Sequence, residues 1–165
     1  SKHDAFFTGF VHKPYPPIYL ELSRNAAFHS ASVIRGTEGG IIPSLRQIGK
    51  VHYYDTPGEE DKMYEVKPED LEINDESRAV DIPDDIVRKD TKDKIESKVS
   101  ATDIAKATVK SGQEALSGRD GAMKSCIQLG ASIILQRMTG NDILKCSKWL
   151  LKVSVRGSAL KRRAL

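Results

Sequence analysis

The stretch SVIRGTEGGIIPSLRQIGKVHYYD, residues 32–55, decides the fold of this chain. It opens with a short apolar run, passes through a glycine-rich turn and ends in a second apolar segment, VHYYD. A short apolar run bounded by turn residues indicates a buried strand, and glycines adopt turn conformations that strain other residues. The pattern therefore predicts a strand, a glycine turn and a further strand. Nucleotide-binding loops have this geometry, and so do many ordinary strand ends.

The segments on either side of this stretch predict further elements. Before it, three prolines precede a helix expected over about residues 17–28. After it, residues 51–55 and 63–66 are expected to form a β-hairpin, because the intervening TPGEED has the residues of a turn. One apolar face of the expected helix is formed by Ile18, Leu22 and Ala26.

The last third of the chain has the apolar periodicity of helices. Helices are expected over about residues 102–118 and 120–138, each ended by a glycine, and a third from residue 141 or 142 onward. Trp149, with two leucines beside it, is expected in the core. The sequence thus predicts an α/β fold, a sheet with flanking helices, that ends in an α-helical segment.

Charge divides the chain into three parts. Residues 55–98 contain 16 acidic and 8 basic residues, whereas the last 25 residues contain seven basic residues and one acid. Residues 74–100 are highly charged and have few large apolar side chains, which is typical of a solvent-exposed connection. We therefore expect an α/β segment at 1–73, a charged linker at 74–100 and three helices at 101–165. The basic end either contacts a polyanion or is simply a solvated surface.

Two cysteines and the absence of long apolar runs bear on the cellular location. Cys126 and Cys146 lie in expected helices without metal-ligand spacing, which favours buried thiols in a reducing compartment. No apolar run reaches the roughly 18 residues of a membrane span. The sequence predicts a soluble protein of the cytoplasm or of an organelle matrix, a plastid included, without a membrane partner. Because it begins at Ser1 rather than at methionine, we expect a fragment or a processed product.

Three segments carry a family resemblance. Residues 33–40, VIRGTEGG, form a strand and glycine turn; residues 64–71 read YEVKPEDL; residues 156–160 read RGSAL. In their order these resemble a strand ending in His-Gly, the pattern Y-x-x-x-P-E-D-[FL] and the SGKAL ending of the anthranilate phosphoribosyltransferase family, also called the glycosyl transferase family a/b domain. The resemblance covers nearly the whole chain and implies the C-terminal half of that fold.

The chain also departs from the family pattern. Family enzymes transfer a phosphoribosyl group from a magnesium-bound pyrophosphate donor, and an Asp-Glu pair after the glycine turn binds the metal. The corresponding residues here are Ile41 and Ile42, which offer no oxygen ligand to a hard cation. Arg35 stands where the family more usually has histidine, and no glycine-rich donor loop is found in the chain. We therefore expect no catalytic residue, no metal site and no cofactor in this chain.

Two sets of residues are candidates for anion binding. Glycine N–H groups and a nearby arginine can hold a phosphate, although a turn without a ligand explains the same residues. The phosphate-binding candidates are Arg35, Gly36, Thr37, Gly39 and Gly40, and the candidates for a polyanion such as DNA or RNA are Arg46, Lys50, Lys161, Arg162 and Arg163.

Two functions follow from the resemblance. The first is a non-catalytic protein that binds phosphate or nucleic acid, because a bacterial branch of the family that binds nucleic acid also has RGTEG at the turn. The second is part of an active phosphoribosyltransferase of tryptophan biosynthesis, which would use anthranilate, phosphoribosyl pyrophosphate and Mg²⁺. That second function requires a partner, the missing N-terminal half of the same protein. Whether this chain belongs to an enzyme, and its oligomeric state, stay open from the sequence.

Overall fold

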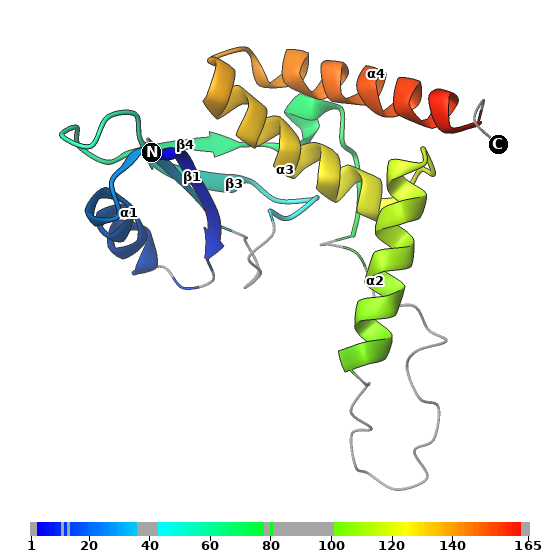
Figure 1. Cartoon of the computed structure of the whole chain (residues 1–165), viewed down its shortest axis with the longest axis horizontal. Helices are drawn as coiled ribbons and strands as arrows, with labels where there is room; N and C mark the ends of the chain where they lie inside the picture. Colours follow the sequence, from blue (N-terminus) through cyan, green and yellow to red (C-terminus); the bar gives the residue numbers. More distant parts are fainter. Residues whose placement is uncertain are drawn as a thin grey trace, which may run out of the picture.

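The computed structural model describes residues 3–10, 12, 14–35, 43–77, 80 and 101–162. The chain has the predicted α/β fold, in which a four-stranded mixed sheet is followed by three helices (Figure 1). The first part contains β1 (His3–Phe10), α1 (Tyr15–Asn25), β2 (Phe28–Arg35), β3 (Gly49–Tyr54), β4 (Lys62–Val66) and the short 3₁₀ helix η2 (Pro68–Leu71). The second part contains α2 (Ala101–Leu116), α3 (Ala122–Thr139) and α4 (Ile143–Arg162).

The sheet has the strand order β1-β2-β3-β4. β1 and β2 are parallel and are joined through α1, whereas β2, β3 and β4 are antiparallel neighbours. The predicted hairpin across TPGEED is confirmed as β3 and β4. β1 is not predicted from the sequence, and β2 is predicted only around Val33 and Ile34, so the sheet is larger than expected.

Helix α1 begins directly after Pro14 and ends at Asn25, three residues before the predicted end. Ala27 then takes a left-handed backbone conformation, with φ of +61°, which ends the helix and leads into β2. Leu20 packs inward on the sheet. The apolar face predicted from Ile18 and Leu22 is exposed instead, so α1 has apolar residues on its outer side as well.

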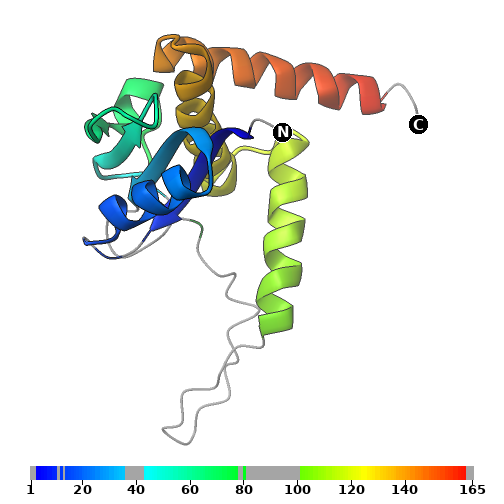
Figure 2. The same cartoon turned by 60° about the vertical axis from the view of Figure 1, so that its left-hand side comes forward.

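The sheet is covered on both faces, by α1 on one and by α3 on the other (Figures 1 and 2). Side chains of successive strand residues point to opposite faces, and β2 shows this directly. Val33 packs in the cluster that contains Leu20 of α1, and Ile34 packs in the cluster that contains Ile133 of α3. One strand thus contributes to both cores.

The three C-terminal helices agree with the prediction in number and position. Glycines with positive φ follow α2 and α3, namely Gly118 at +100° and Gly140 at +69°. Both cysteines are buried and free, as predicted. The prediction for Trp149 is wrong, because this side chain lies on the outer side of α4 and is 55% exposed. α2 projects away from the sheet (Figure 1).

None of the helices in the described ranges is both long enough and apolar enough to span a membrane. The division into parts at 1–73, 74–100 and 101–165 stays a prediction, because most of the expected linker lies outside the described residues.

Candidate anion site at the end of the parallel strands

The parallel strands β1 and β2 end side by side. Phe10, the last residue of β1, pairs in register with Arg35, the last residue of β2, and Arg35 also pairs with Lys50 of β3. In open α/β sheets, ligands bind in the crevice outside the carboxyl ends of the parallel strands. In the sequence, Arg35 is followed directly by the residues of the predicted glycine turn, which lie outside the described residues.

Positive charge collects at this end. Arg35 and Lys50 are cross-strand neighbours, and Lys50 is balanced in part by Glu65, whose carboxylate lies 3.6 Å from its ammonium group. Burial, followed by the charges of Lys50 and Arg35, lowers the pKa of His52, which lies two residues further along β3. His52 is therefore neutral over a wider pH range than an exposed histidine, and it contributes no charge of its own near neutrality.

Arg35 has an unsatisfied polar atom. Its Nε is buried and has no hydrogen-bond partner among the described residues. A buried N–H group of a charged side chain is costly when it has no acceptor. An anion bound beyond the strand end would supply an acceptor, and a backbone carbonyl of the turn would do so equally.

The structure describes only part of the candidate residues. Gly36, Thr37, Gly39 and Gly40 lie outside the described residues, as does Arg163. Lys161 and Arg162 belong to the last turn of α4 by their backbone, and their side chains are not described.

Of the two polyanion candidates whose side chains are described, Lys50 lies beside Arg35 and Arg46 does not. Arg46 lies in the segment before β3, where its guanidinium donates a hydrogen bond of 3.4 Å to the carbonyl of Glu76. The C-terminal end of α4 points away from the sheet in both views (Figures 1 and 2). Among the candidates whose side chains are described, Lys50 is thus placed beside Arg35, and Arg46 has a different partner.

Two polar networks, neither of them predicted from the sequence, join the helices to the sheet. In the first, the guanidinium of Arg137 on α3 lies 3.8 Å above the ring of Tyr53, donates a 3.1 Å hydrogen bond to Ser32 and forms an ion pair with Asp55. These contacts attach the C-terminal part of α3 to β2 and β3.

Two pKa values are shifted near Arg137, those of Asp55 and Tyr64. Partial burial alone would raise the pKa of Asp55, but its hydrogen bond and ion pair with Arg137, together with Lys62, lower it overall. Burial raises the pKa of Tyr64 to about 12, and its hydroxyl donates a 3.0 Å hydrogen bond to Gln136.

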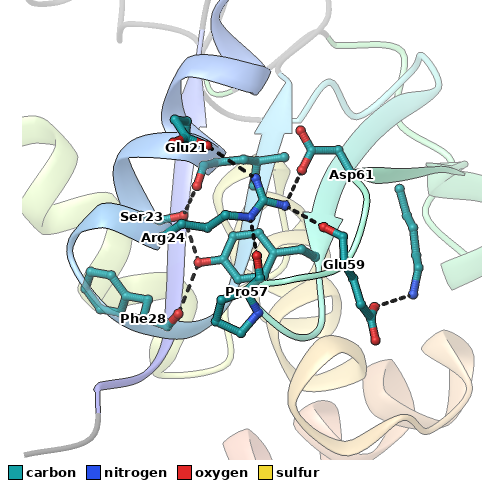
Figure 3. A network of polar contacts seen from close by, with 10 residues as sticks. Glu21, Ser23, Arg24, Phe28, Pro57, Glu59 and Asp61 are labelled. Carbon is teal, nitrogen blue, oxygen red and sulfur yellow. Dashed lines mark hydrogen bonds and ion pairs between the residues drawn. The ribbon is translucent and has the colours of Figure 1, made fainter.

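The second network is centred on Arg24 of α1 (Figure 3). Its guanidinium donates to the carbonyls of Pro57 and Glu59 at 2.9 and 3.0 Å and to the carboxylate of Asp61 at 2.6 Å. It also lies 4.3 Å from the ring centroid of Tyr54. Arg24 thus fastens α1 to the turn of the β3–β4 hairpin.

The described residues include no group of three or more histidine, cysteine, aspartate or glutamate side chains that could hold a metal ion. A cavity of about 810 Å³ lies between α2 and α3, away from the strand ends, and acidic and basic side chains are mixed along its wall. The charge of this cavity gives no preference for an anion or a cation.

Comparison with known proteins supports the fold. No protein-family model and no curated protein matches the chain. Among solved structures, the chain is similar to anthranilate phosphoribosyltransferase from Saccharomyces cerevisiae in complex with 4-fluoroanthranilate, with a TM-score of 0.66 and 13% sequence identity. The match covers 96% of this chain and 40% of that protein. The predicted resemblance is therefore confirmed for the fold, and the chain spans less than half the length of the protein that it matches.

Proposed function

We propose that this chain is a non-catalytic phosphate-binding protein segment with the fold of the C-terminal part of an anthranilate phosphoribosyltransferase. The observation that carries the proposal is the buried Nε of Arg35, which has no partner among the described residues and lies where the parallel strands end. The turn after Arg35 contains Gly36, Thr37, Gly39 and Gly40, whose backbone N–H groups complete the anion site.

The proposal includes no transfer reaction. By resemblance, Ile41 and Ile42 stand at the positions of the metal-binding carboxylates. Without oxygen ligands there, Mg²⁺ has no place beside a pyrophosphate donor. The site then holds a phosphate group by charge and by backbone N–H groups alone.

Titration with inorganic pyrophosphate tests this site. We expect Arg35→Gln to weaken pyrophosphate binding at least tenfold in isothermal titration calorimetry, because the variant removes the charge and keeps a polar side chain. Arg119→Gln is the control, since Arg119 is an exposed arginine in the α2–α3 connection. Equal affinity of the Arg35 variant and the unchanged chain would show that the turn binds no phosphate through this residue. Far-UV circular dichroism checks that both variants are folded.

The polyanion that we propose as a partner is DNA or RNA. Its phosphates would contact Arg46, Lys50 and the basic end of α4, Lys161 to Arg163. Counterion release makes such binding sequence-independent and strongly dependent on salt. Reversing the three charges at the end of α4 should flatten the dependence of affinity on salt concentration. A filter-binding titration at low salt without retention above a neutral control protein would refute this part of the proposal.

The likeness to a transferase favours a second candidate, a segment of an active phosphoribosyltransferase. Its donor-binding half would be a partner, and Mg²⁺ and phosphoribosyl pyrophosphate would be its cofactor and donor. Release of pyrophosphate from phosphoribosyl pyrophosphate, with anthranilate and Mg²⁺ present, distinguishes the two candidates. We expect no turnover by the 165-residue chain, and robust turnover would replace the non-catalytic proposal.

A further inference from the structure

His52 lies on the same face of the sheet as the two cationic residues of the candidate anion site. Val33 packs in the cluster that contains Leu20 of α1, and His52 is the cross-strand partner of Val33. Arg35 and Lys50 form the next pair on this face, because side chains two positions apart along a strand point to the same side. The face that α1 covers therefore carries Arg35, Lys50 and His52 together.

The strand register also sets how close these residues are to one another. Lys50 and His52 are two positions apart on β3, which corresponds to a separation of about 6.5 Å along the strand. Arg35 and His52 are diagonal neighbours on adjacent strands, and such neighbours lie roughly 7 to 8 Å apart. Both separations are within the Debye length of about 8 Å at physiological salt, so the charges of the two cations reach the imidazole.

A ring contact holds the half-buried imidazole of His52 near the strand ends. The imidazole packs edge-on against the buried ring of Phe10, with 5.9 Å between the ring centroids. Phe10 is the last residue of β1 and pairs in register with Arg35. One phenylalanine thus lies beside both the histidine and the arginine.

Charged groups from several elements act on this imidazole. Burial, followed by the charges of Lys50 on β3 and Arg35 on β2, lowers its pKa from the ordinary value of 6.5. Asp61, which precedes β4, acts in the opposite direction, but its carboxylate is also bound by Arg24 of α1 at 2.6 Å (Figure 3). Glu65 of β4 offsets part of the charge of Lys50, from which it lies 3.6 Å away. The two cations therefore outweigh the nearby carboxylates at the imidazole, and an anion bound at Arg35 would reverse this balance.

We infer that His52 makes the anion site at Arg35 dependent on pH, since the protonated imidazole strengthens the binding of an anion and a bound anion favours the protonated imidazole. The inference rests on the proposed anion site and adds a regulatory residue to it. Binding and protonation are linked, so each strengthens the other by the same factor. For a dianion about 7 Å from the new positive charge in a largely aqueous environment, Coulomb's law predicts that affinity increases roughly threefold to tenfold at low ionic strength.

Sulfate is the probe that tests this linkage, because it keeps two negative charges from about pH 5 to about pH 8, the range in which histidines titrate. Proton NMR follows the imidazole resonances of the 165-residue chain over this range, in saturating sulfate and in chloride of equal, low ionic strength. The pKa of His52 should be higher in sulfate by about 0.5 to 1 pH unit, which corresponds to the expected gain in affinity. In Arg35→Gln this difference should disappear. In chloride alone, the pKa of His52 should be higher in Arg35→Gln than in the unchanged chain, since a neighbouring positive charge is gone.

His29 is the matched control, because it is an exposed histidine near the opposite end of β2. Its titration should be the same in both salts. Calorimetry should show tighter sulfate binding at about pH 5 than at about pH 8 in the unchanged chain and in His29→Gln, and no such gain in His52→Gln, with circular dichroism checking the fold at both pH values. If sulfate binds through Arg35 and the titration of His52 is the same in both salts, or if His29 shifts as much as His52, the inference fails and the proposed anion site stands. If sulfate and pyrophosphate both fail to bind, the proposed site and the inference fail together.

Discussion

Replacing Arg24 by methionine tests how much the hairpin turn contributes to holding α1 on the sheet. The methionine keeps an unbranched apolar stem and removes the guanidinium of a side chain that is 19% exposed. The change deletes the hydrogen bonds to the carbonyls of Pro57 and Glu59 and the ion pair with Asp61 (Figure 3). It also deletes the contact of the guanidinium with the ring of Tyr54.

The expected loss follows from these contacts. A hydrogen bond that involves a charged group contributes about 1.5 to 3 kcal/mol, and a cation–π contact at a partly exposed site about 0.5 to 1 kcal/mol. The terms do not add fully, because the turn carbonyls can accept water once the arginine is gone, and because the freed side chain regains up to about 2 kcal/mol of rotamer entropy. We expect Arg24→Met to reduce the free energy of unfolding by roughly 2 to 3 kcal/mol. Arg24→Lys should lose about half of that, since lysine keeps the charge and lacks the planar fork.

Urea unfolding followed by circular dichroism measures both variants. Arg119→Met is the control, because Arg119 is also paired with a carboxylate, that of Glu114 at 2.5 Å, and is 71% exposed. Exposed ion pairs contribute little, so this control should lose less than about 0.5 kcal/mol. If Arg24→Met is no more destabilising than Arg119→Met, the network in Figure 3 adds nothing net to stability and the reasoning is wrong.

Three further predictions concern α3 and its contacts with the sheet. Gly130→Ala, inside α3, should stabilise the chain by about 0.5 to 1 kcal/mol in urea unfolding, whereas Gly140→Ala should destabilise it by about 1 kcal/mol; a new Cβ meets open space at both positions, and only Gly140 has a positive φ. Burial raises the pKa of Tyr64 to about 12 from an ordinary value of 10.0. The free energy of unfolding should therefore fall as the pH rises through this interval. Measured by unfolding at a series of pH values, this decrease should be smaller in Tyr64→Phe, which has no hydroxyl to ionise. Partial burial alone would raise the pKa of Asp55, yet Arg137 and Lys62 lower it overall. The Asp55 carboxylate should therefore add to the free energy of unfolding above its ordinary pKa of 3.8, and this addition should be lost at more acidic pH. An Asp55→Asn variant whose stability falls in acid as much as that of the unchanged chain would contradict this.

The helices and the hairpin could be predicted because their signals are local. Gly118 and Gly140 end helices since a glycine accepts positive φ at no steric cost, and each lies directly after an apolar periodic segment. TPGEED combines proline, glycine and charge between two short apolar runs, which is sufficient for a turn between neighbouring strands. In each case the deciding residues lie within a few positions of one another.

The missed features depend on residues far apart in the sequence. β1 and β2 pair although a helix separates them in the sequence, so that His3 lies beside Phe28. The residues of β1 show no local alternation of polar and apolar side chains that would predict a strand. Arg137 and Asp55 are separated by 82 positions, and only the packing of α3 on the sheet brings them together. Periodicity also identifies which residues share a face and not which face is covered. For this reason Trp149, which is expected in the core, lies outside, and the apolar face of Ile18 and Leu22 is the exposed side of its helix.

The candidate anion site shows the same division. Arg35 could be selected from the sequence because it follows an apolar run and precedes glycines. Lys50 adds positive charge beside Arg35 because the register of β2 and β3 places the two residues opposite each other. Their positions in the sequence alone do not show this. The basic residues 161–163 are close to each other in sequence, and the described backbone of α4 runs away from the sheet toward its C-terminal end (Figures 1 and 2). A clustered charge in the sequence is thus a weaker argument for a shared site than a single arginine at the carboxyl end of a parallel strand, since only the latter is positioned by the fold where ligands bind.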